Sequence, residues 1–372
     1  MRSLFIFDPS DMNARVVGGV QLCSQEFLKI VQAASNSVDY LEVKVCRQLF
    51  WRVRRKLNLG AYLWYNPNEV RAKLIAKKIE YAPTHIFINK SELIRLTPLL
   101  RSVFPEAQIG LMSHGNQSGD DLYEISGARG ARNRGLRTFM ATLKIGQDLV
   151  TESWFRHRYV DFVCVMSEEE SVLERWLGCK STVVLPRTIT NRTLSWQPVV
   201  GRIGFVGTLN HTPNKVALDL ICEEIAKKST LEEIKVELRL VGKPESEGLR
   251  LASSYSFVKY LGALNDEDLE SEVSSWSLFL NPIFWLSRGA SMKLGQAISF
   301  GIPFVTTQSG KRGYVLEGAE FLITSDNPQD FVARVVELMN DDQNIKAKAL
   351  VENIQITSPT VQSLANLVAR VL

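Results

Sequence analysis

Short apolar runs alternate with amphipathic segments along most of this chain. Runs rich in β-branched and aromatic residues predict buried strands, for example at His85–Asn89, Val160–Met166 and Ile203–Gly207. The segments that follow many of them repeat apolar residues every three or four positions, which predicts helices. Strand–helix alternation of this kind is typical of a parallel sheet that is covered on both faces. We therefore predict an α/β protein.

The alternation stops once, between Pro186 and Gly201, in the polar stretch PRTITNRTLSWQPVVG. This stretch has proline near both ends and no clear period, so we interpret it as an interdomain linker. A chain of 372 residues is also too long for one ordinary core. We predict two doubly wound, Rossmann-like domains facing across a cleft, where ligands of such sheets bind. The predicted parts are 1–187, the linker 188–200, the second domain 201–358, and a C-terminal helix 359–372 that could pack back on the first domain.

No apolar run approaches the roughly 18 residues that a membrane-spanning helix needs. The run Leu4–Phe7 is too short for the core of a signal peptide, so we expect a cytoplasmic protein. The five cysteines are scattered without a CxxC pair, which argues against zinc and against a disulfide framework.

Charge separates the two halves of the chain. Residues 1–198 hold 27 Lys and Arg against 19 Asp and Glu, whereas residues 199–372 hold 17 against 21. A basic first half suits phosphate groups, an anionic membrane surface or nucleic acid. No nucleic-acid-binding motif is present and the excess is small, so we expect no nucleic-acid partner.

The segment Cys46–Leu59 concentrates this positive charge. On a helix, its spacing would place Leu49, Phe50, Val53 and Leu57 on one face and arginines and a lysine on the rest. Such a helix can lie on the inner, anionic face of a membrane as a peripheral contact. It can equally be a solvated helix that packs its apolar face on its own sheet.

A glycine at the end of a predicted strand marks the first candidate site, in IGFVGTLNHTPNK. Gly207 lets backbone N–H groups approach a phosphate, and the next helix N-terminus adds about half a positive charge. Thr208 lies in the loop, and Lys215 could add a full charge. The alternative is a plain strand–helix turn.

The stretch RGASMKLGQAISFGIPFVTT carries the second candidate site. Gly289 and the small residue Ser291 precede a helix whose first turn holds Lys293. A cation is poorly placed near a helix N-terminus unless an anion such as a diphosphate lies between them. The alternative is a surface lysine whose stem covers apolar neighbours.

Two further candidates lie in the first half. Gly18 and Gly19 in VVGGVQ permit positive φ and close approach to a ligand, or make an ordinary tight turn. His114 ends a predicted strand in LMSHGNQSGDD and could donate to a polar ligand or serve in acid–base chemistry, although a lone histidine is often structural. No nucleophile elbow, zinc-protease motif or GxxxxGK[ST] loop is present.

Taken together, these segments resemble a family 4-type glycosyltransferase of GT-B fold over nearly the whole chain. IGFVGTLNHTPNKVALDLICEEI resembles the strand–loop–helix "FVG…PN…A", and VELRLVG…VKYLGALNDEDLESEVSSWSLFLNPIF resembles the run before the donor site. RGASMKLGQAISFGIPFVTTQSGKRGY resembles the donor motif "G…K…EA…G.PVV.T..G..G". VVGGVQ resembles the glycine-rich loop, SHG the histidine motif, and RYVDFVCVMSEEESVLERWLG the end of the first domain.

The resemblance implies a hexosyltransferase-like enzyme that retains the sugar's anomeric configuration. Its donor would be a nucleotide sugar, with neither cofactor nor catalytic metal. Its acceptor would be a glycan or a lipid-linked glycan, in surface polysaccharide or lipopolysaccharide synthesis. Lys293 would hold the donor diphosphate and stabilise the leaving nucleotide, with Gly207 and its loop along the same diphosphate. His114 would contact the donor sugar, and Gly18 and Gly19 would approach the phosphates or shape the acceptor site.

The sequence departs from the family where many members carry two glutamates eight positions apart. Arg288 aligns with the first and Gln296 with the second. Gln296 can still hydrogen-bond ribose hydroxyls, and Arg288 could bind a charged sugar or a phosphate. The departure leaves open a catalytically inactive relative that acts as a binding or scaffold protein. A sugar epimerase is a weaker alternative, because no convincing carboxylate pair is present.

Overall fold

The computed structural model describes residues 1–13, 18–57, 64–126, 135–232, 235–285 and 289–371. These residues form two compact units, the first made of Met1–Pro186 with Thr360–Leu372 and the second of Arg187–Pro359. Each unit contains its own six-stranded sheet, and all strand pairs in both sheets are parallel. The predicted α/β class with two doubly wound sheets is confirmed.

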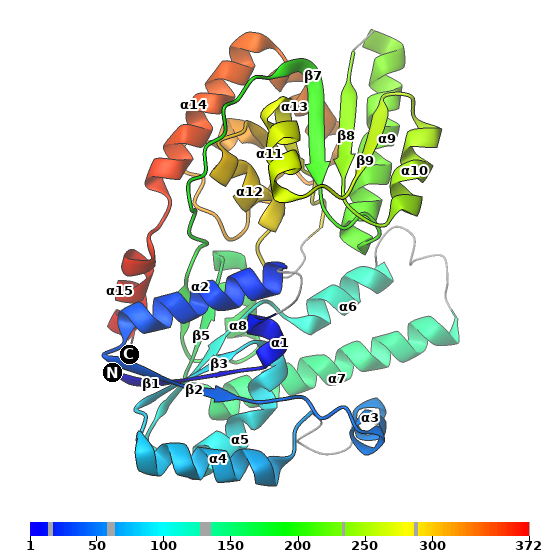
Figure 1. Ribbon diagram of the computed structural model, residues 1–372. Coiled ribbons are helices and arrows are strands. Elements are labelled where there is room, and N and C mark those ends of the chain that lie inside the picture. The colour runs from blue at the N-terminus through cyan, green and yellow to red at the C-terminus, as the bar shows by residue number, and fades with distance from the viewer. Residues whose placement is uncertain (14–17, 58–63, 127–134, 233–234, 286–288, 372) are drawn as a thin grey trace. The chain divides into compact units, whose positions relative to one another are not determined.

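The first unit is built on a sheet with the strand order β2-β1-β3-β4-β5-β6. In that order the strands are Ser37–Glu42, Arg2–Phe7, His85–Asn89, Gln108–Met112, Phe162–Val165 and Thr182–Val184. Helices α2 (Gly19–Ala34) and α15 (Val361–Val371) pack together on one face (Figure 1). The other face is covered by α4 (Pro67–Glu80), α5 (Thr97–Val103) and α7 (Leu136–Tyr159).

Local sequence explains why these elements begin where they do. Strand β1 is apolar on both sides, as a strand buried between two helical layers must be. Helix α4 has Pro67 in its first turn, and the Asn66 side chain accepts a hydrogen bond from the backbone N–H of Asn68. Helix α8 (Glu168–Trp176) begins in the same way, at Ser167.

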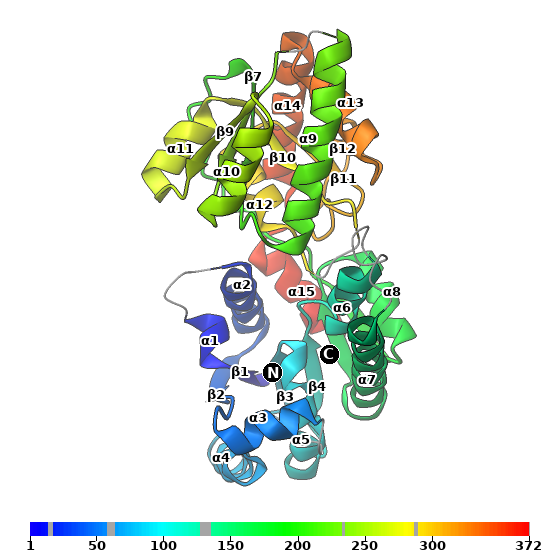
Figure 2. The same cartoon turned by 90° about the vertical axis from the view of Figure 1, so that its right-hand side faces the viewer.

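The second unit is built on a sheet with the strand order β12-β11-β10-β7-β8-β9. In that order the strands are Ile323–Thr324, Phe304–Thr307, Trp276–Asn281, Val199–Val206, Glu237–Val241 and Val258–Gly262. Helix α9 (Thr212–Glu232) packs against α13 (Pro328–Leu338), and α12 (Met292–Phe300) packs against α14 (Asp341–Thr357), as Figure 2 shows. Helix α11 (Asp266–Ser274) precedes β10.

Strand order identifies one point in each sheet where a ligand site is expected. In the first unit the chain passes from β1 to β2 in one direction and then crosses back to β3. In the second unit, β7 and β10 are neighbours although three helices and two strands separate them in sequence. At such switch points the connections leave in opposite directions, which opens a crevice at the carboxyl ends of the strands.

The sequence pattern does not predict helices α6 (Gln117–Ser126), α10 (Glu245–Ser254) and α14. Helix α6 is held by Glu152, whose carboxylate accepts hydrogen bonds from its first N–H groups and lies far away in sequence. Helix α10 carries Gly248 in its middle, where a Cβ would lie 2.1 Å from the Tyr260 ring.

Two other segments are shorter or less regular than the sequence pattern suggests. The segment 92–103 begins as the 3-10 turn η1 (Ser91–Leu96) before α5. The basic helix is only α3 (Leu49–Lys56). Two short elements complete the description, α1 (Pro9–Met12) and η3 (Glu320–Leu322).

Candidate functional site

The carboxyl ends of β7 and β8 lie unusually close together in the second unit. The backbone N–H of Gly207 donates to the Val241 carbonyl over 3.0 Å. Gly242 has a φ of +142°, and a Cβ there would lie 1.8 Å from the Gly207 oxygen. Only glycine fits this position, so the loop after β7 is placed by backbone geometry rather than by side chains.

Lys293 reaches this loop from α12. Its ammonium donates to Asn214 Oδ1 over 2.9 Å, while Asn214 Nδ2 donates to the Thr208 carbonyl over 2.9 Å. The ammonium also lies 5.3 Å from the centre of the Phe205 ring. Burial lowers the pKa of Lys293 to about 8. Among the described residues no carboxylate pairs with it, so the site holds a partly buried cation without a described counter-ion.

Within the described part of the chain, no side chain caps the N-terminus of α12 beside Lys293. Ser291 occupies the cap position, but its hydroxyl donates to Asn281 Oδ1 over 2.6 Å and makes no cap bond to its own helix. The Tyr314 hydroxyl donates to the Ser291 carbonyl over 2.8 Å and holds this residue in place. Gly289, with a φ of +73°, makes the turn into it. First-turn N–H groups without a side-chain cap, at the positive end of a helix dipole, form a ready anion site.

Asn281 connects this helix start to the sheet. It is the last residue of β10 and is fully buried. Its Nδ2 donates to Thr306 Oγ1 over 2.9 Å and to the Gly310 carbonyl over 3.1 Å. The start of α12 is therefore fixed relative to β10 and β11 before any ligand arrives.

The structure separates the two lysines that the sequence suggests for phosphate binding. The Lys215 ammonium forms an ion pair with Glu247, and Arg250 binds the same carboxylate at 2.8 Å. These cations lower the pKa of Glu247 through their hydrogen bonds. Lys215 is thus already compensated, whereas Lys293 is not.

Two other residues that the sequence suggests for donor binding belong to the second unit. Gln296 lies almost one turn after Lys293 along α12, so the two side chains leave neighbouring positions of the helix surface. Arg288 lies outside the described residues.

His114 is placed at the switch point of the first unit. Its Nε2 lies 3.1 Å from Asn89 Oδ1, and its ring meets the Phe27 ring edge-on with centres 5.4 Å apart. Asn89 Nδ2 donates to Ser24 Oγ over 3.0 Å. The histidine is therefore held by α2 and by the end of β3, and it is buried apart from a small exposed fraction.

The glycines of VVGGVQ start the same helix that holds His114. Helix α2 begins at Gly19, and the N–H of Gly18 donates to Gln21 Oε1 over 3.0 Å. Gln21 Nε2 donates to the Ser10 carbonyl over 2.9 Å, which ties this helix start to the segment after β1. Helix α2 thus carries the paired glycines at its start and Ser24 further along. Hydrogen bonds connect Ser24 through Asn89, at the end of β3, to His114, which follows β4.

Comparison with known families identifies the second half of the chain. Residues 201–341 match the family model described as "Glycosyl transferases group 1". This stretch, 141 of the 372 residues, is similar to a group 1 glycosyltransferase domain. Gly207, Lys293 and the open N-terminus of α12 all lie within it. The comparison with curated proteins finds no match to the sequence.

Solved structures share the fold over the whole chain. Anabaena HepE in complex with UDP-glucose aligns with a TM-score of 0.62 at 13% identity, covering 100% of this chain and 99% of that one. The lipopolysaccharide outer core galactosyltransferase WaaB aligns with 0.63 at 13% identity, covering 100% of both chains. Trehalose-6-phosphate synthase OtsA aligns with 0.62 at 14% identity, covering 98% and 97%. The chain has the GT-B fold, and together with the group 1 domain this supports a glycosyltransferase.

Sequence reasoning misses the asparagines of both units, although a signal for two of them exists. Asn89 and Asn281 each end an apolar strand, in HIFIN and in LFLN. A carboxamide at the end of a buried strand is costly unless it is hydrogen-bonded, so its presence there indicates a site that needs orientation. Asn214 and Tyr314 give no such signal, because their partners are distant in sequence.

None of the described helices has the length and apolar character that crossing a membrane requires.

Proposed function

We propose that this chain is a family 4-type, retaining glycosyltransferase that takes a sugar from a nucleoside diphosphate donor without a catalytic metal. The observation that carries the proposal is Lys293, a partly buried ammonium with no described carboxylate partner, beside the N-terminus of α12, which no described side chain caps. This arrangement suits an anion with several oxygens, such as a diphosphate. The structural relatives that contain UDP or UDP-glucose support a nucleotide-sugar donor.

Charge development gives the catalytic logic. When the bond from the sugar's anomeric carbon to the diphosphate breaks, negative charge grows on the leaving oxygen. The Lys293 ammonium and the first N–H groups of α12 are fixed before the reaction, so they stabilise this charge without reorganising. In this proposal they supply the positive charge that a metal ion supplies elsewhere. The acceptor hydroxyl attacks on the face the nucleotide leaves, and its proton passes to the departing diphosphate.

His114 and the glycines of the first unit have the second role in the proposal. His114 would contact the donor sugar near the transfer point, and Gly18 and Gly19 would border the donor phosphates or the acceptor. The hydrogen bond between His114 Nε2 and Asn89 Oδ1 supports this assignment, because it fixes the orientation of the imidazole ring. Thr208 and Gln296 would bind the remaining donor groups.

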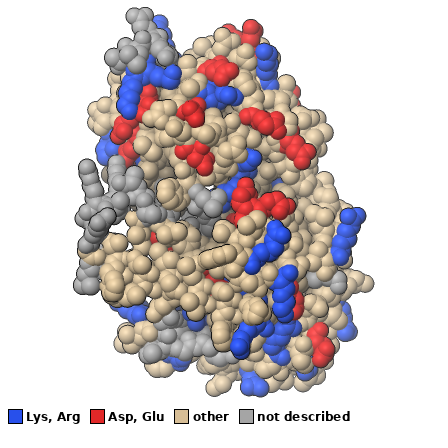
Figure 3. Space-filling model, turned by 180° about the vertical axis from the view of Figure 1, so that it is seen from behind, with Lys and Arg blue, Asp and Glu red and all other residues tan. Residues whose placement is uncertain are grey.

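The exposed face of α3 supports an acceptor at a membrane. Leu49, Phe50, Val53 and Leu57 are between 46% and 75% exposed, so these four side chains do not pack on the sheet, and Trp51 is the residue that α3 buries. Residues 43–68 contain six basic residues and no acidic one. Basic side chains also predominate over the first unit on the face in Figure 3, where that unit is the lower part. We propose that α3 contacts an anionic, inner membrane surface and that the acceptor is a lipid-linked glycan.

Calorimetric titration with UDP, GDP, ADP and their common sugar conjugates tests the donor site. We expect one nucleotide family to bind the wild-type protein and Lys293→Ala to lose that binding. Lys215→Ala is the matched control, because Lys215 is already paired with Glu247 and should retain most of the affinity. If none of these nucleotides binds, the donor site is wrong. Binding without transfer to any glycan acceptor would favour the nucleotide-binding scaffold instead.

Vesicle sedimentation tests the membrane contact. Vesicles containing phosphatidylglycerol should retain the protein at low salt and release it as salt rises, because screening weakens attraction between the basic helix and the lipid headgroups. Phe50→Ser should reduce this binding, whereas Ile79→Ser on α4, which is 80% exposed, should not. Binding that ignores salt, or that both variants reduce equally, would remove α3 from the proposal.

A further inference from the structure

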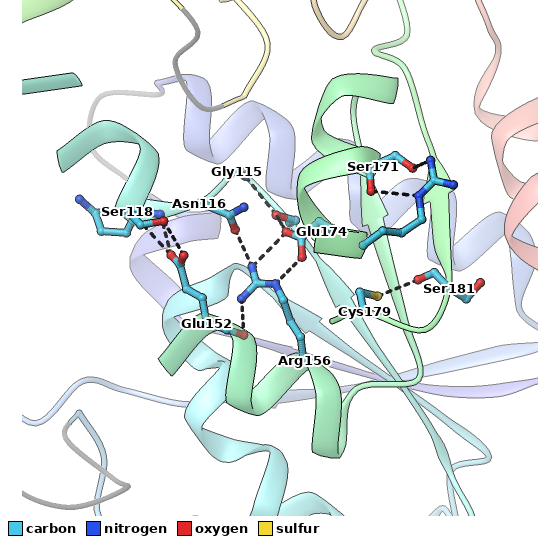
Figure 4. Close-up of polar contacts among 12 residues, drawn as sticks. Gly115, Asn116, Ser118, Glu152, Arg156, Ser171, Glu174, Cys179 and Ser181 are labelled. Atoms are coloured by element: carbon cyan, nitrogen blue, oxygen red, sulfur yellow. Dashed lines mark hydrogen bonds and ion pairs between the residues drawn. The ribbon is translucent and has the colours of Figure 1, made fainter. Parts of the chain in front are cut away.

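The segment Ser113–Ser118, which joins β4 to α6, is hydrogen-bonded to buried charged residues of α7 and α8. Figure 4 shows these residues converging on it from α7 and α8. Ser113 Oγ donates to Glu174 Oε1 over 3.2 Å and accepts from the Gly115 N–H over 3.1 Å. His114, between them, binds in another direction, toward Asn89 and Phe27.

Arg156 is the centre of this group. Its side chain is 0% exposed and forms an ion pair with Glu174, which is 1% exposed. Its Nη2 donates to Asn116 Oδ1 over 2.6 Å, and its Nη1 donates to the Glu152 carbonyl over 3.1 Å. Burial opposes the charged guanidinium, but the Glu174 carboxylate outweighs it and raises the pKa of Arg156.

Glu152 holds the end of the same segment. Its Oε1 accepts hydrogen bonds from the N–H groups of Gln117 at 3.0 Å and Ser118 at 3.4 Å. Its Oε2 accepts from the Ser118 hydroxyl at 2.6 Å. A carboxylate in this position caps α6 and compensates the positive end of its dipole.

Stability alone is a poor explanation for such a group. Removing charges from water costs free energy, and a buried ion pair often stabilises a protein no better than apolar residues of the same volume. A guanidinium does supply direction, since its planar donors bind a carboxylate and a carboxamide at fixed angles. Here those angles fix the residues on either side of His114.

We infer that Arg156, Glu174 and Glu152 are positioning residues that set the place and orientation of His114. The expected effect on catalysis rests on the proposed function, whereas the effect on the position of His114 does not. The group binds Ser113, Asn116 and Ser118 directly, and it reaches Gly115 through the Ser113 hydroxyl. Asn89 and Phe27 receive the imidazole on the other side. A shift of the segment would move the histidine relative to Asn89 and to any donor sugar.

Arg156→Lys tests the inference, because it keeps the charge and loses the fork of donors. The matched control is Arg101→Lys on α5, whose side chain binds residues next to the amino ends of β4 and β5. Arg101 forms an ion pair with Asp161 and donates to the Ala107 carbonyl over 2.7 Å. The readout that does not depend on turnover is the ring resonance of His114. It can be followed by NMR with labelled histidine and identified among the four histidines through His114→Gln.

We expect Arg156→Lys to move or broaden the His114 resonance and to lower kcat on the order of tenfold, while the KM for the donor stays within about twofold. Arg101→Lys should leave the His114 resonance, kcat and KM unchanged at temperatures below the unfolding midpoint of that variant. An unaltered His114 resonance in a folded Arg156→Lys protein would overturn the inference. If that variant does not fold, Asn116→Ala replaces it, since it keeps the ion pair and removes one loop contact. Absence of transfer by the wild-type protein would count against the proposed function only, because the resonance still reports on position.

Discussion

The candidate sites of the two units solve opposite electrostatic problems. In the first unit, the charges around the His114 segment are compensated, because Arg156 meets Glu174 and Glu152 meets the start of α6. In the second unit, Lys293 and the N-terminus of α12 remain uncompensated among the described residues. Charged groups that already have partners hold a surface rigid, whereas a cation without a counter-charge gives affinity for an anion.

This contrast teaches how a fold can divide labour between orientation and binding. A buried cation without a counter-ion lowers the stability of the free protein, and a bound anion would return that free energy as affinity. A network whose polar groups are all hydrogen-bonded adds no free energy to ligand binding, but it keeps its geometry. The predictions below test each side of this division.

The largest expected effect is on the backbone of the second unit. Gly242→Ala would place a methyl group against the Gly207 oxygen at a positive φ, so we expect a loss of about 3 kcal/mol or more in the free energy of unfolding, together with nucleotide binding. Urea denaturation measures the loss. Gly262→Ala is the control, since its φ is +77° but nothing lies within 4 Å of a Cβ there. Equal losses in both variants would mean that the close approach of the two strand ends is unimportant.

Lys293→Met should separate stability from binding. The folded pKa of about 8 lies below the unfolded value of about 10.4, so the buried ammonium destabilises the free protein fully below pH 8. We expect the variant to gain about 1–3 kcal/mol of stability at pH 7 and to bind nucleotide about a hundredfold more weakly. The gain should shrink as the pH rises from 8 to 10. A variant less stable than wild type at pH 7 would contradict this account of Lys293.

Donor binding should be coupled to proton uptake. A diphosphate beside Lys293 should raise its pKa, so binding of whichever nucleotide sugar the titration identifies should take up close to one proton (on the order of 0.5–1) near pH 9, and almost none at pH 6.5. A nucleotide sugar is preferable to UDP here, since its doubly esterified diphosphate does not titrate in this range. Calorimetry in buffers of different ionisation enthalpy measures the uptake, and Lys293→Met should abolish it. Equal uptake at both pH values would exclude Lys293 as the titrating group.

The smallest expected effect is on the first unit. Burial raises the pKa of Glu152, against the hydrogen bonds from Ser118, so its ionisation costs stability as the pH rises through the folded value. Glu152→Gln removes this ionisation but keeps an acceptor, and we expect a change within about 1 kcal/mol at pH 7. Denaturation between pH 4.5 and 7 should show a flatter profile than wild type. A steeper profile would mean that the carboxylate is stabilised rather than penalised by its surroundings.

Most of the fold can be predicted from the sequence because buried parallel strands are locally distinctive. His85–Asn89 is a strand with the predicted bounds, and the predicted strand Val160–Met166 is shorter in the structure, where β5 spans Phe162–Val165. Helices α6 and α14 are harder, since each depends on a distant partner. Glu152 holds α6, and buried Asn344 of α14 donates to the carbonyl of Ser277 in β10.

The candidate site is predictable only in part, for the same reason. Lys293 and Gly207 are visible because a lysine at a helix start and a glycine at a strand end contradict ordinary patterns. That Lys293 is uncompensated and Lys215 is compensated depends on Glu247, which is 32 residues from Lys215. The group around Arg156 joins α7, α8 and the segment after β4, and no local pattern indicates it.

The path of the chain also sets an order of assembly during synthesis. The second unit is continuous from Arg187 to Pro359, whereas the first unit is completed only by Thr360–Leu372. Leu364, Ala365 and Val368 of α15 are buried, and α15 packs against α2, the helix that starts at the paired glycines and holds His114. Because domains fold as they leave the ribosome, the second unit can be finished while α2 still lacks its cover. A nascent chain would therefore gain its anion site before its histidine is locked in place.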